Sequence, residues 1–291
     1  MKRFGVRKIM SKQEWTTIIK PKTSVFDLNL KEVWQYRDLI YMFLKRNFTS
    51  SYKQTILGPL WFLITPLLTS SMFTVVFGQI AKISTDGVPQ FLFYLAGNTA
   101  WGYFSACLNA TSHTFTANAH IFSRVYYPRL VAPITSVIYA LLSFAIQLLL
   151  MLVLMAFFVF ARGEMVYPNL WILSVPLLIL QMALMGMGLG IIISSITTKY
   201  RDLSILVSFG VQLWMYATPI VYPLSQVPDF LQKVIRINPM TPIVNNFKYA
   251  FLGCGTLEFG SWIYSWIFTI VVLFLGVVLF SKVEKTFIDT V

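Results

Sequence analysis

The sequence predicts an all-α protein that crosses a membrane about six times, and its composition and the spacing of its charges carry this prediction. Hydrophobic residues make up 57% of the 291 positions and charged residues 12%, and the mean hydropathy is +0.69. Soluble domains of this length are markedly less apolar. Six stretches also lack Asp, Glu, Lys and Arg over more than the roughly 20 residues that a helix needs to cross a hydrocarbon core.

The uncharged stretches set the boundaries of the expected spans. These spans are about 56–80, 90–112, 131–160, 170–196, 204–222 and 259–281. The longest stretch, from Gly87 to Ser123, has a polar second half that includes Asn109 and His113. We therefore assign it one span, followed by a cytoplasmic connecting segment.

Basic residues indicate the orientation, because Lys and Arg near the spans are retained on the cytoplasmic side. Twelve of the 23 precede Ile56, and six more fall in alternate loops on that same side. Both termini are then expected in the cytoplasm. This bias and contact with anionic lipids account for the net charge of +12, so we expect membrane lipids but no nucleic acid as a partner.

The chain before the first span divides into two parts. Residues 1–29 are basic with little periodicity and are expected to form a cytoplasmic tail. Over residues 30–55, apolar side chains such as Val33, Ile40 and Phe43 recur at helical spacing. This pattern predicts an amphipathic helix lying on the cytoplasmic membrane face. The alternative is a cytoplasmic helix packed on the protein's own loops.

The cytoplasmic segment between the second and third spans, Phe115 to Pro128, mixes apolar and polar side chains. We expect a short helix there that is able to dock on a partner. The alternative is an ordinary connecting loop.

A long outside segment, Tyr222 to Gly255, is divided by four prolines. Its residues 229–237 fit two helical turns, and Thr241-Pro242 pairs an N-cap with a first-turn proline before a helix that closes near Gly253. We expect two short helices that return into the outer leaflet. Because irregular backbone at membrane depth must be buried in protein or line a cavity, this arrangement indicates a pore or a gate.

The fourth span contains three closely spaced glycines, Gly186, Gly188 and Gly190. Small residues at such spacing allow helices to approach closely in lipid. A dinucleotide-binding loop would need a preceding strand and a different spacing. We therefore expect a helix-packing role.

The sequence lacks the residues that several kinds of chemistry require. No Gly-rich loop ending in Gly-Lys-Ser or Gly-Lys-Thr occurs in the sequence, so we expect no enzyme here and ATP hydrolysis by another chain. Every Asp and Glu falls outside the expected spans, which disfavours coupling to an ion gradient. His113 and His120 are expected to be wetted loop residues, and Cys107 and Cys254 lack metal-ligand spacing, so no metal site is expected.

Aromatic residues make up 16% of the chain. Their flat faces suit the apolar faces of sugar rings, so an aromatic conduit for a glycan is physically reasonable. The candidates in the first and fifth spans are Trp61, Phe73, Phe77, Phe209, Trp214 and Tyr216. The alternative for each of them is lipid contact or helix packing.

Three sequence elements, taken in order, carry a resemblance to a known family. They are the stretch Tyr52 to Trp61, which reads Tyr-Lys-Gln-Thr-Ile-Leu-Gly-Pro-Leu-Trp and is followed by Pro66-Leu67, then Tyr200-Arg201-Asp202-Leu203, then Asn238-Pro239-Met240-Thr241-Pro242. Together they resemble the permease subunits of ABC-2 type polysaccharide exporters, and the first element is closest to the O-antigen type. The resemblance covers the chain from about Leu30 to its end.

The resemblance implies a homodimeric channel of six-helix subunits in the bacterial inner membrane, with residues 56–291 as the transmembrane domain. Two copies of a cytoplasmic ATPase would bind ATP and Mg, so no cofactor is expected in this chain. The cargo would be a polysaccharide assembled on undecaprenyl pyrophosphate. The amphipathic helix would be the interface helix that touches the ATPase, and the two short outside helices would be the periplasmic gate.

The resemblance also assigns roles to residues. Contact with the ATPase would involve Arg37, Phe122, Arg124 and Tyr126; Leu57 and Gly58 match the loop before the first span; and the periplasmic gate would contain Pro239, Thr241 and Pro242. Arg46 and Lys53 lie near the expected cytoplasmic mouth and could attract the lipid pyrophosphate, unless they only anchor the chain at the membrane.

Other functions fit parts of the sequence. An ABC-2 permease for a drug or a lipid would share the topology without needing a wide aromatic conduit. A membrane-embedded glycan acyltransferase would also be basic and aromatic, but it would work without an ATPase and depend on His113. A secondary carrier is disfavoured by the absence of carboxylates from the expected spans.

Overall fold

The computed structural model describes residues 30–290, except for 54–56, 123–126, 165 and 198–201. The described residues form helices and no strand, which confirms the predicted all-α class. The main helices are α1 (Leu30–Gln35), α2 (Arg37–Tyr52), α3 (Trp61–Phe73), α4 (Gln90–Ser112), α5 (Thr114–Phe122), α6 (Val131–Arg162), α7 (Val175–Thr197), α8 (Leu203–Tyr216), α9 (Asp229–Ile237), α10 (Met240–Leu252) and α11 (Phe259–Thr290). Shorter turns are η1 (Gly58–Leu60), the π-helix η2 (Thr74–Ile80), η3 (Leu170–Ser174) and η4 (Leu224–Gln226).

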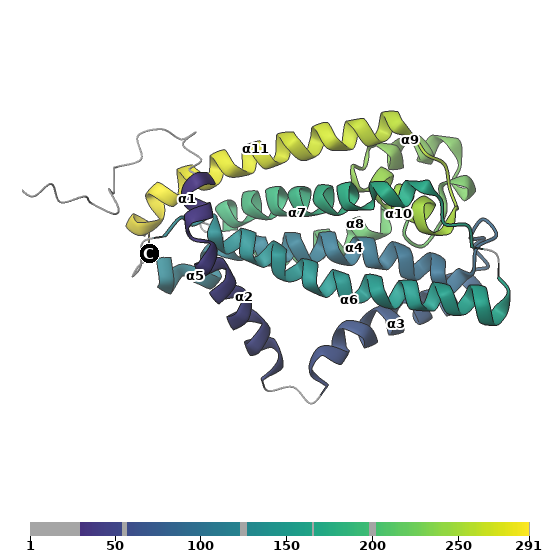
Figure 1. Cartoon of the computed structure of the whole chain (residues 1–291). Helices are drawn as coiled ribbons and strands as arrows, with labels where there is room; N and C mark the ends of the chain where they lie inside the picture. Colours follow the sequence, from purple (N-terminus) through teal and green to yellow (C-terminus); the bar gives the residue numbers. More distant parts are fainter. Residues whose placement is uncertain (1–29, 54–56, 123–126, 165, 198–201, 291) are drawn as a thin grey trace, which may run out of the picture.

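The long helices run side by side as one elongated bundle (Figure 1). Helix α7 packs against α4 and against α11, and α4 also packs against α6. Helices α1 and α5 lie at one end of the bundle and α9 and α10 at the other, so we call these the α5 end and the α10 end. Helix α2 runs diagonally away from the α5 end, and α3 turns back toward the α10 end, so that the two form a V.

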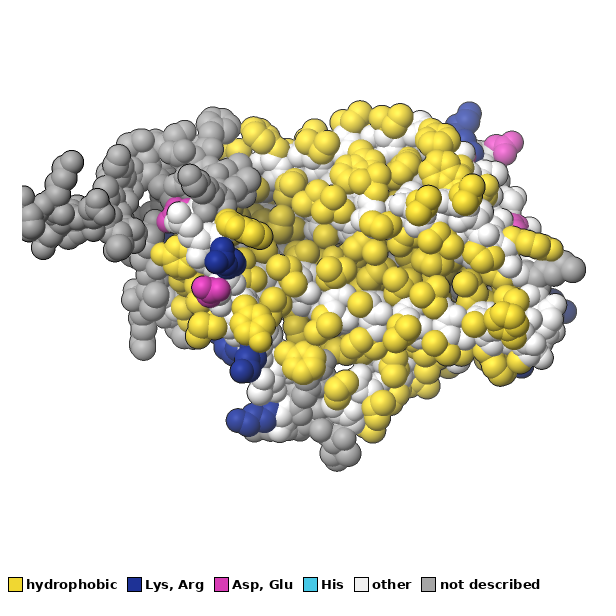
Figure 2. Space-filling view, in the orientation of Figure 1, with side chains coloured by type: hydrophobic (Ala, Val, Ile, Leu, Met, Phe, Trp, Pro, Cys, Tyr) yellow, Lys and Arg dark blue, Asp and Glu magenta, His cyan; other side chains and the backbone are white. Residues whose placement is uncertain are grey.

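On the face shown in Figure 2, apolar side chains cover the middle of the bundle, and the charged side chains lie toward its two ends. Four helical segments are long and apolar enough to cross a membrane: 58–80, 131–162, 170–197 and 259–283. Helix α8 is apolar but shorter, and the 23-residue α4 is rich in small and aromatic residues. The chain is therefore a multi-pass membrane protein, and the count of six spans stays a prediction.

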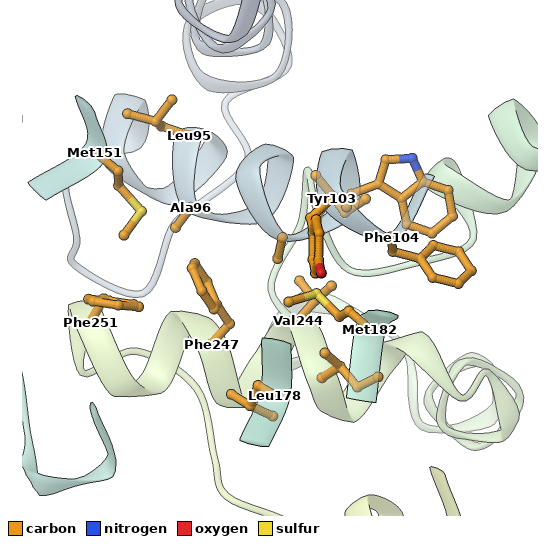
Figure 3. Close-up of a cluster of buried hydrophobic side chains, with 14 of the residues drawn as sticks. Leu95, Ala96, Tyr103, Phe104, Met151, Leu178, Met182, Val244, Phe247 and Phe251 are labelled. Atoms are coloured by element: carbon orange, nitrogen blue, oxygen red, sulfur yellow. The ribbon is translucent and has the colours of Figure 1, made fainter. Parts of the chain in front are cut away.

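The core is centred on α4, whose side chains are buried on nearly all sides. Figure 3 shows Leu95, Tyr103 and Phe104 of this helix together with Met182 of α7 and Phe247 of α10. The Tyr103 ring lies 4.8 Å from that of Phe144 on α6. Because lipid is as apolar as these side chains, close packing rather than expulsion of water holds such a core together.

The glycines of α7 face both of its neighbours. A Cβ atom on Gly186 would lie 2.8 Å from the Cβ atom of Cys107 on α4, and one on Gly188 would lie 2.9 Å from the backbone of Leu273 on α11. A Cβ atom on Gly276 of α11 would lie 2.7 Å from the carbonyl oxygen of Gly188. Real side chains do not fit at such distances, so the predicted packing role of this glycine series is confirmed.

Two elements differ from the sequence prediction. The amphipathic segment is two helices rather than one, because Tyr36 leaves the helical conformation (φ −90°, ψ 22°) between α1 and α2. The fifth expected span, 204–222, is helical only to Tyr216, and turns follow. Pro219 explains this early end, since a proline lacks an N–H donor and disfavours the helical conformation of the residue before it, Thr218.

Candidate functional site

A second apolar cluster, separate from the main core, holds the α5 end together. Its buried members are Val33, Phe115, Phe122, Tyr127, Val131, Ala132, Ile191 and Phe280. They come from α1, α5, the start of α6, α7 and α11, and partly buried side chains of α2 pack against them. The short helices of this end are therefore packed directly onto the long ones.

Within this α5-end cluster, aromatic rings form a continuous series of contacts. The Phe115 ring stacks on that of Phe280 with the centroids 4.6 Å apart, and it meets the Phe122 ring at 6.1 Å. Tyr127 lies 5.6 Å from Phe122 and 5.8 Å from Phe43 on α2. The series thus joins α11 to α5 and α2 through the segment after α5. Such ring pairs add about 0.5–1.5 kcal/mol each beyond the area they bury.

The residues predicted to contact an ATPase differ in how exposed they are. The Phe122 ring is only 6% exposed, and the Arg129 guanidinium lies over it at 5.4 Å. Phe122 is therefore placed to anchor α5 onto the bundle rather than to present a surface. Arg37 is exposed on α2. Arg124 and Tyr126 lie outside the described residues.

The turn between α2 and α3 contains the Leu-Gly pair singled out in the sequence. Leu57 is partly exposed, and its carbonyl accepts a hydrogen bond from the Leu60 amide at 2.9 Å. Gly58 has φ +46°, which favours glycine at this position because a side chain is strained there. Arg46 on α2 and Lys53, the residue after this helix, are both exposed. The Arg46 guanidinium lies 4.7 Å from the centre of the Phe43 ring.

The six aromatic residues proposed to line a conduit fall into two groups. Trp61, Phe209 and Tyr216 are 49%, 59% and 45% exposed. Phe73 is buried and lies edge-on to Tyr94 at 6.3 Å, and Phe77 packs against it at 5.6 Å. Trp214 points inward, where its ring meets Trp101 at 6.0 Å and Phe104 at 5.2 Å. Phe73, Phe77 and Trp214 therefore pack against the core of the bundle, and the exposed side chains face away from it.

At the α10 end, the side chain of Asn238 links the end of α8 to the turn between α9 and α10. Its Oδ1 accepts hydrogen bonds from the Trp214 indole Nε1 at 2.9 Å and from the Met240 amide at 3.0 Å. Its Nδ2 donates to the Thr218 hydroxyl at 2.9 Å and to the Ala217 carbonyl at 3.2 Å. We call this arrangement the Asn238 junction.

The first turn of α10 is held by the long helices. The Ser265 hydroxyl of α11 donates to the Pro239 carbonyl at 2.7 Å, and it accepts a hydrogen bond from Gln181 Nε2 of α7 at 2.8 Å. Gln181 Oε1 in turn accepts from the Trp262 indole at 2.9 Å. Thr241 donates to the Ile235 carbonyl of α9 at 2.7 Å. Thr241 and the neighbouring Pro242 are buried, so the residues predicted for the gate sit in a fixed part of the structure.

Lys248 holds the middle of α10 against the end of α8. Its Nζ donates to the carbonyls of Pro219 at 2.8 Å and Ile220 at 2.9 Å, and it lies 3.5 Å from the centre of the Phe93 ring. The side chain is fully buried, and this desolvation lowers the pKa of Lys248 to about 7. The sequence placed Lys248 on the outside, where a basic residue is normally solvated. It instead satisfies two carbonyls that the end of α8 leaves unpaired.

Helix α9 contrasts with α10. No residue of α9 is buried, and its apolar side chains Phe230, Leu231, Val234 and Ile237 are all exposed. Its main tie outside the hairpin is the ion pair of Arg236 with Glu258 at 2.6 Å. Of the two short helices, α9 is therefore the less tightly packed.

A cavity of about 350 Å³ opens at the α10 end. Lining residues include Asp86, Ser225, Gln232, Arg236, Asn245, Lys248 and Thr256. A smaller one of about 10 Å³ lies beside it and shares Arg236, Asn245 and Thr256. We call the larger space the end cavity.

Sequence reasoning missed several of these residues, although most left a signal. Gln181 is a polar residue within an otherwise apolar span, and Lys248 is a charge within an apolar helix; both types usually mark a specific contact at membrane depth. Asn238 was noted only as the first residue of the Asn-Pro-Met-Thr-Pro element. Ser265 gave no signal, because isolated serines are common in membrane helices.

Comparison with known proteins finds the family that the sequence elements resemble. The family model of the ABC-2 type transporter matches residues 38–252. An O-antigen export system permease protein of Klebsiella pneumoniae is 28% identical over 87% of this chain and 94% of its own length, and one of Myxococcus xanthus is 28% identical over 76% and 83%. The polysialic acid transport protein of Escherichia coli is 23% identical over 80% and 89%. The chain is a membrane transport component and belongs to the ABC-2 type transporter family.

Proposed function

We propose that this chain is the permease subunit of an ATP-driven exporter of lipid-linked polysaccharide, of the O-antigen type, in the bacterial inner membrane. The observation that carries the proposal is the match to O-antigen export permeases along 87% of the chain. In this proposal two copies form the channel and two copies of a separate ATPase supply the energy. The α5 end faces the cytoplasm, and the α10 end faces the periplasm.

The packing of the described helices supports a route from the ATPase to the exit. Movement of α2 or α5 would act on α7 and α11 through the α5-end cluster, where Phe115 stacks on Phe280 at 4.6 Å. Helices α7 and α11 continue to the α10 end, where Gln181 and Ser265 hold the start of α10. Because glycines hold α7 and α11 in close backbone contact, the pair would move as one rigid unit.

The two short helices, α9 and α10, would then have different roles in the gate. Helix α10 is buried along most of its length and would remain with α7 and α11. Helix α9 has no buried residue and would swing on the Asn238 junction. The moving part of the gate would therefore be α9, while Pro239, Thr241 and Pro242 form its fixed base.

The channel would form between two copies at α3 and α8. In the apolar window of the first candidate span only 11% of the residues are buried, and α8 has Val211 as its one buried residue among those described. Exposed Trp61, Phe209 and Tyr216 would face the channel, where their rings can contact sugar rings. Phe73, Phe77 and Trp214 would support that wall from behind. Arg46 and Lys53 would attract the lipid pyrophosphate at the entrance.

Deletion of the gene, followed by analysis of the cell-surface polysaccharide, tests the function. Loss of surface glycan with accumulation of the lipid-linked polymer in the inner membrane is the expected result. Purification of the tagged chain should recover an ABC ATPase in equal amount. Unchanged surface glycan would instead favour a permease for a drug or a lipid, and a chain purified without any ATPase would contradict the proposed pairing with an ATPase.

A further inference from the structure

We propose that the end cavity is a binding subsite for one neutral sugar unit of the exported chain. This inference rests on the proposed function. The cavity lies between α9 and α10 and the loops around Asp86, Ser225 and Thr256. Its volume of about 350 Å³ is at the lower end of the roughly 300–1,000 Å³ typical of small-ligand sites.

Uncommitted hydrogen-bonding groups line this space. Among the described residues, Asn245 has no side-chain partner, although it lines both the end cavity and the smaller space beside it. The Nδ2 of Asn246, which lines the smaller space, is buried without a hydrogen-bond partner, and the residue is 3% exposed. A buried amide without a partner is unfavourable, and a bridging water or a ligand hydroxyl that reached it would satisfy it.

The charges around the end cavity and the smaller space balance in sign, because Arg236 and Lys248 line them together with Asp86 and Glu258. Arg236 is paired with Glu258 at 2.6 Å, and Lys248 donates to two backbone carbonyls. Asp86 accepts a hydrogen bond from Ser225 at 2.7 Å, which leaves its second carboxylate oxygen as an acceptor. With acids and bases balanced, an anionic ligand gains little here. Amide, hydroxyl and carboxylate groups on several sides instead match the many hydroxyl groups of a neutral pyranose.

The position of the cavity suggests its purpose. Its walls include Arg236 of α9, which moves in the proposed gate, and Lys248 of α10, which does not. A sugar bound between them would contact both the fixed and the moving helix. The subsite would therefore hold a sugar unit at the exit while the gate is closed and release it when α9 swings away.

The test uses the purified permease–ATPase complex in lipid nanodiscs and oligosaccharides released by mild acid from the host's own surface polysaccharide. Binding is measured by saturation-transfer NMR and titration calorimetry, with polysialic acid oligomers as the acidic comparison. Asn245→Leu, which keeps the side-chain size but removes the amide, should weaken binding roughly tenfold. Thr256→Trp, on an exposed loop, should block the cavity. The matched control Asn109→Leu, outside the cavity, should bind like wild type.

The possible results separate the subsite from the transport function. If the wild-type complex exports polysaccharide but binds no neutral oligosaccharide, the subsite is refuted and the proposed function stands. Wild-type affinity in both Asn245→Leu and Thr256→Trp would likewise refute the subsite. Equal binding of the acidic oligomers would overturn the assignment to a neutral sugar. If deletion of the gene leaves surface glycan unchanged, the proposed function itself fails.

Discussion

The Trp214 indole donates a hydrogen bond to Asn238 at 2.9 Å across 24 positions of sequence. Together with the other hydrogen bonds of the Asn238 junction, this contact fixes the end of α8 to the turn between α9 and α10. It also explains why Trp214 points into the bundle, against Trp101 and Phe104, and not toward lipid. The α10 end of the molecule is therefore held by a partly buried polar junction beside these aromatic rings.

Replacing Asn238 with Leu should destabilise the α10 end. The change leaves the Trp214 indole and the Met240 amide without their acceptor and the Ala217 carbonyl and Thr218 hydroxyl without their donor. Each unpaired group costs about 1–3 kcal/mol where it is buried. Thermal unfolding in nanodiscs should show a lower transition temperature than for Asn109→Leu, whose amide makes one local bond to Ser105. Equal transitions for the two variants would contradict the role of the junction.

Replacing Lys248 with Met should loosen α10 from α8. The variant keeps an apolar side chain beside Phe93 but leaves the carbonyls of Pro219 and Ile220 unpaired. We expect a loss of about 1–3 kcal/mol in stability, together with faster hydrogen exchange in residues 217–222. Lys233→Met, on the exposed side of α9, is the matched control and should change neither. Wild-type exchange in Lys248→Met would show that this lysine does not hold the segment.

The stacked rings of Phe115 and Phe280 should make an energetic coupling between α5 and α11. A double-mutant cycle with Phe115→Leu and Phe280→Leu should give a coupling energy of about 0.5–1.5 kcal/mol in stability, as for other aromatic pairs. Under the proposed function, each single variant should also separate ATP hydrolysis from glycan export. Both are measured on the permease–ATPase complex. Additive effects of the two changes on stability, together with unchanged export, would contradict the proposed route from the ATPase to the α10 end.

The fold class followed from sequence because composition and helical spacing are strong signals in membrane proteins. The bounds of α9 also matched the expected 229–237 helix, since a proline precedes it and an Asn-Pro pair ends it. The early end of α8 was missed, although Pro219 was visible. The long apolar stretch suggested a helix through the whole span, but the proline ended the helix before it.

The orientation of side chains could not be read from sequence. In a soluble helix the apolar face marks the core, but lipid is also apolar, so Phe73, which is buried, and Phe209, which is 59% exposed, look alike in a pattern. The bond between Trp214 and Asn238 and the contacts of Lys248 with the end of α8 join residues more than 20 positions apart. Such partners depend on tertiary packing, and no local spacing predicts them.

The glycine series of α7 offers a last test of how closely the helices must pack. Gly188→Ala adds one methyl group where α11 leaves no room: its Cβ atom would lie 2.9 Å from the Leu273 backbone, and Gly276 of α11 faces it just as closely. Inserting a methyl group into such a tightly packed contact costs about 1–3 kcal/mol. Gly210→Ala on α8 is the matched control, because a Cβ atom there meets nothing within 4 Å. Thermal unfolding of both variants should show a clear loss for Gly188→Ala and little change for Gly210→Ala. Because α7 and α11 are the proposed rigid link between the ATPase and the exit, Gly188→Ala should also slow export. Equal stability of the two variants would mean that α11 can shift away from α7, and the link between the two ends would then not be rigid.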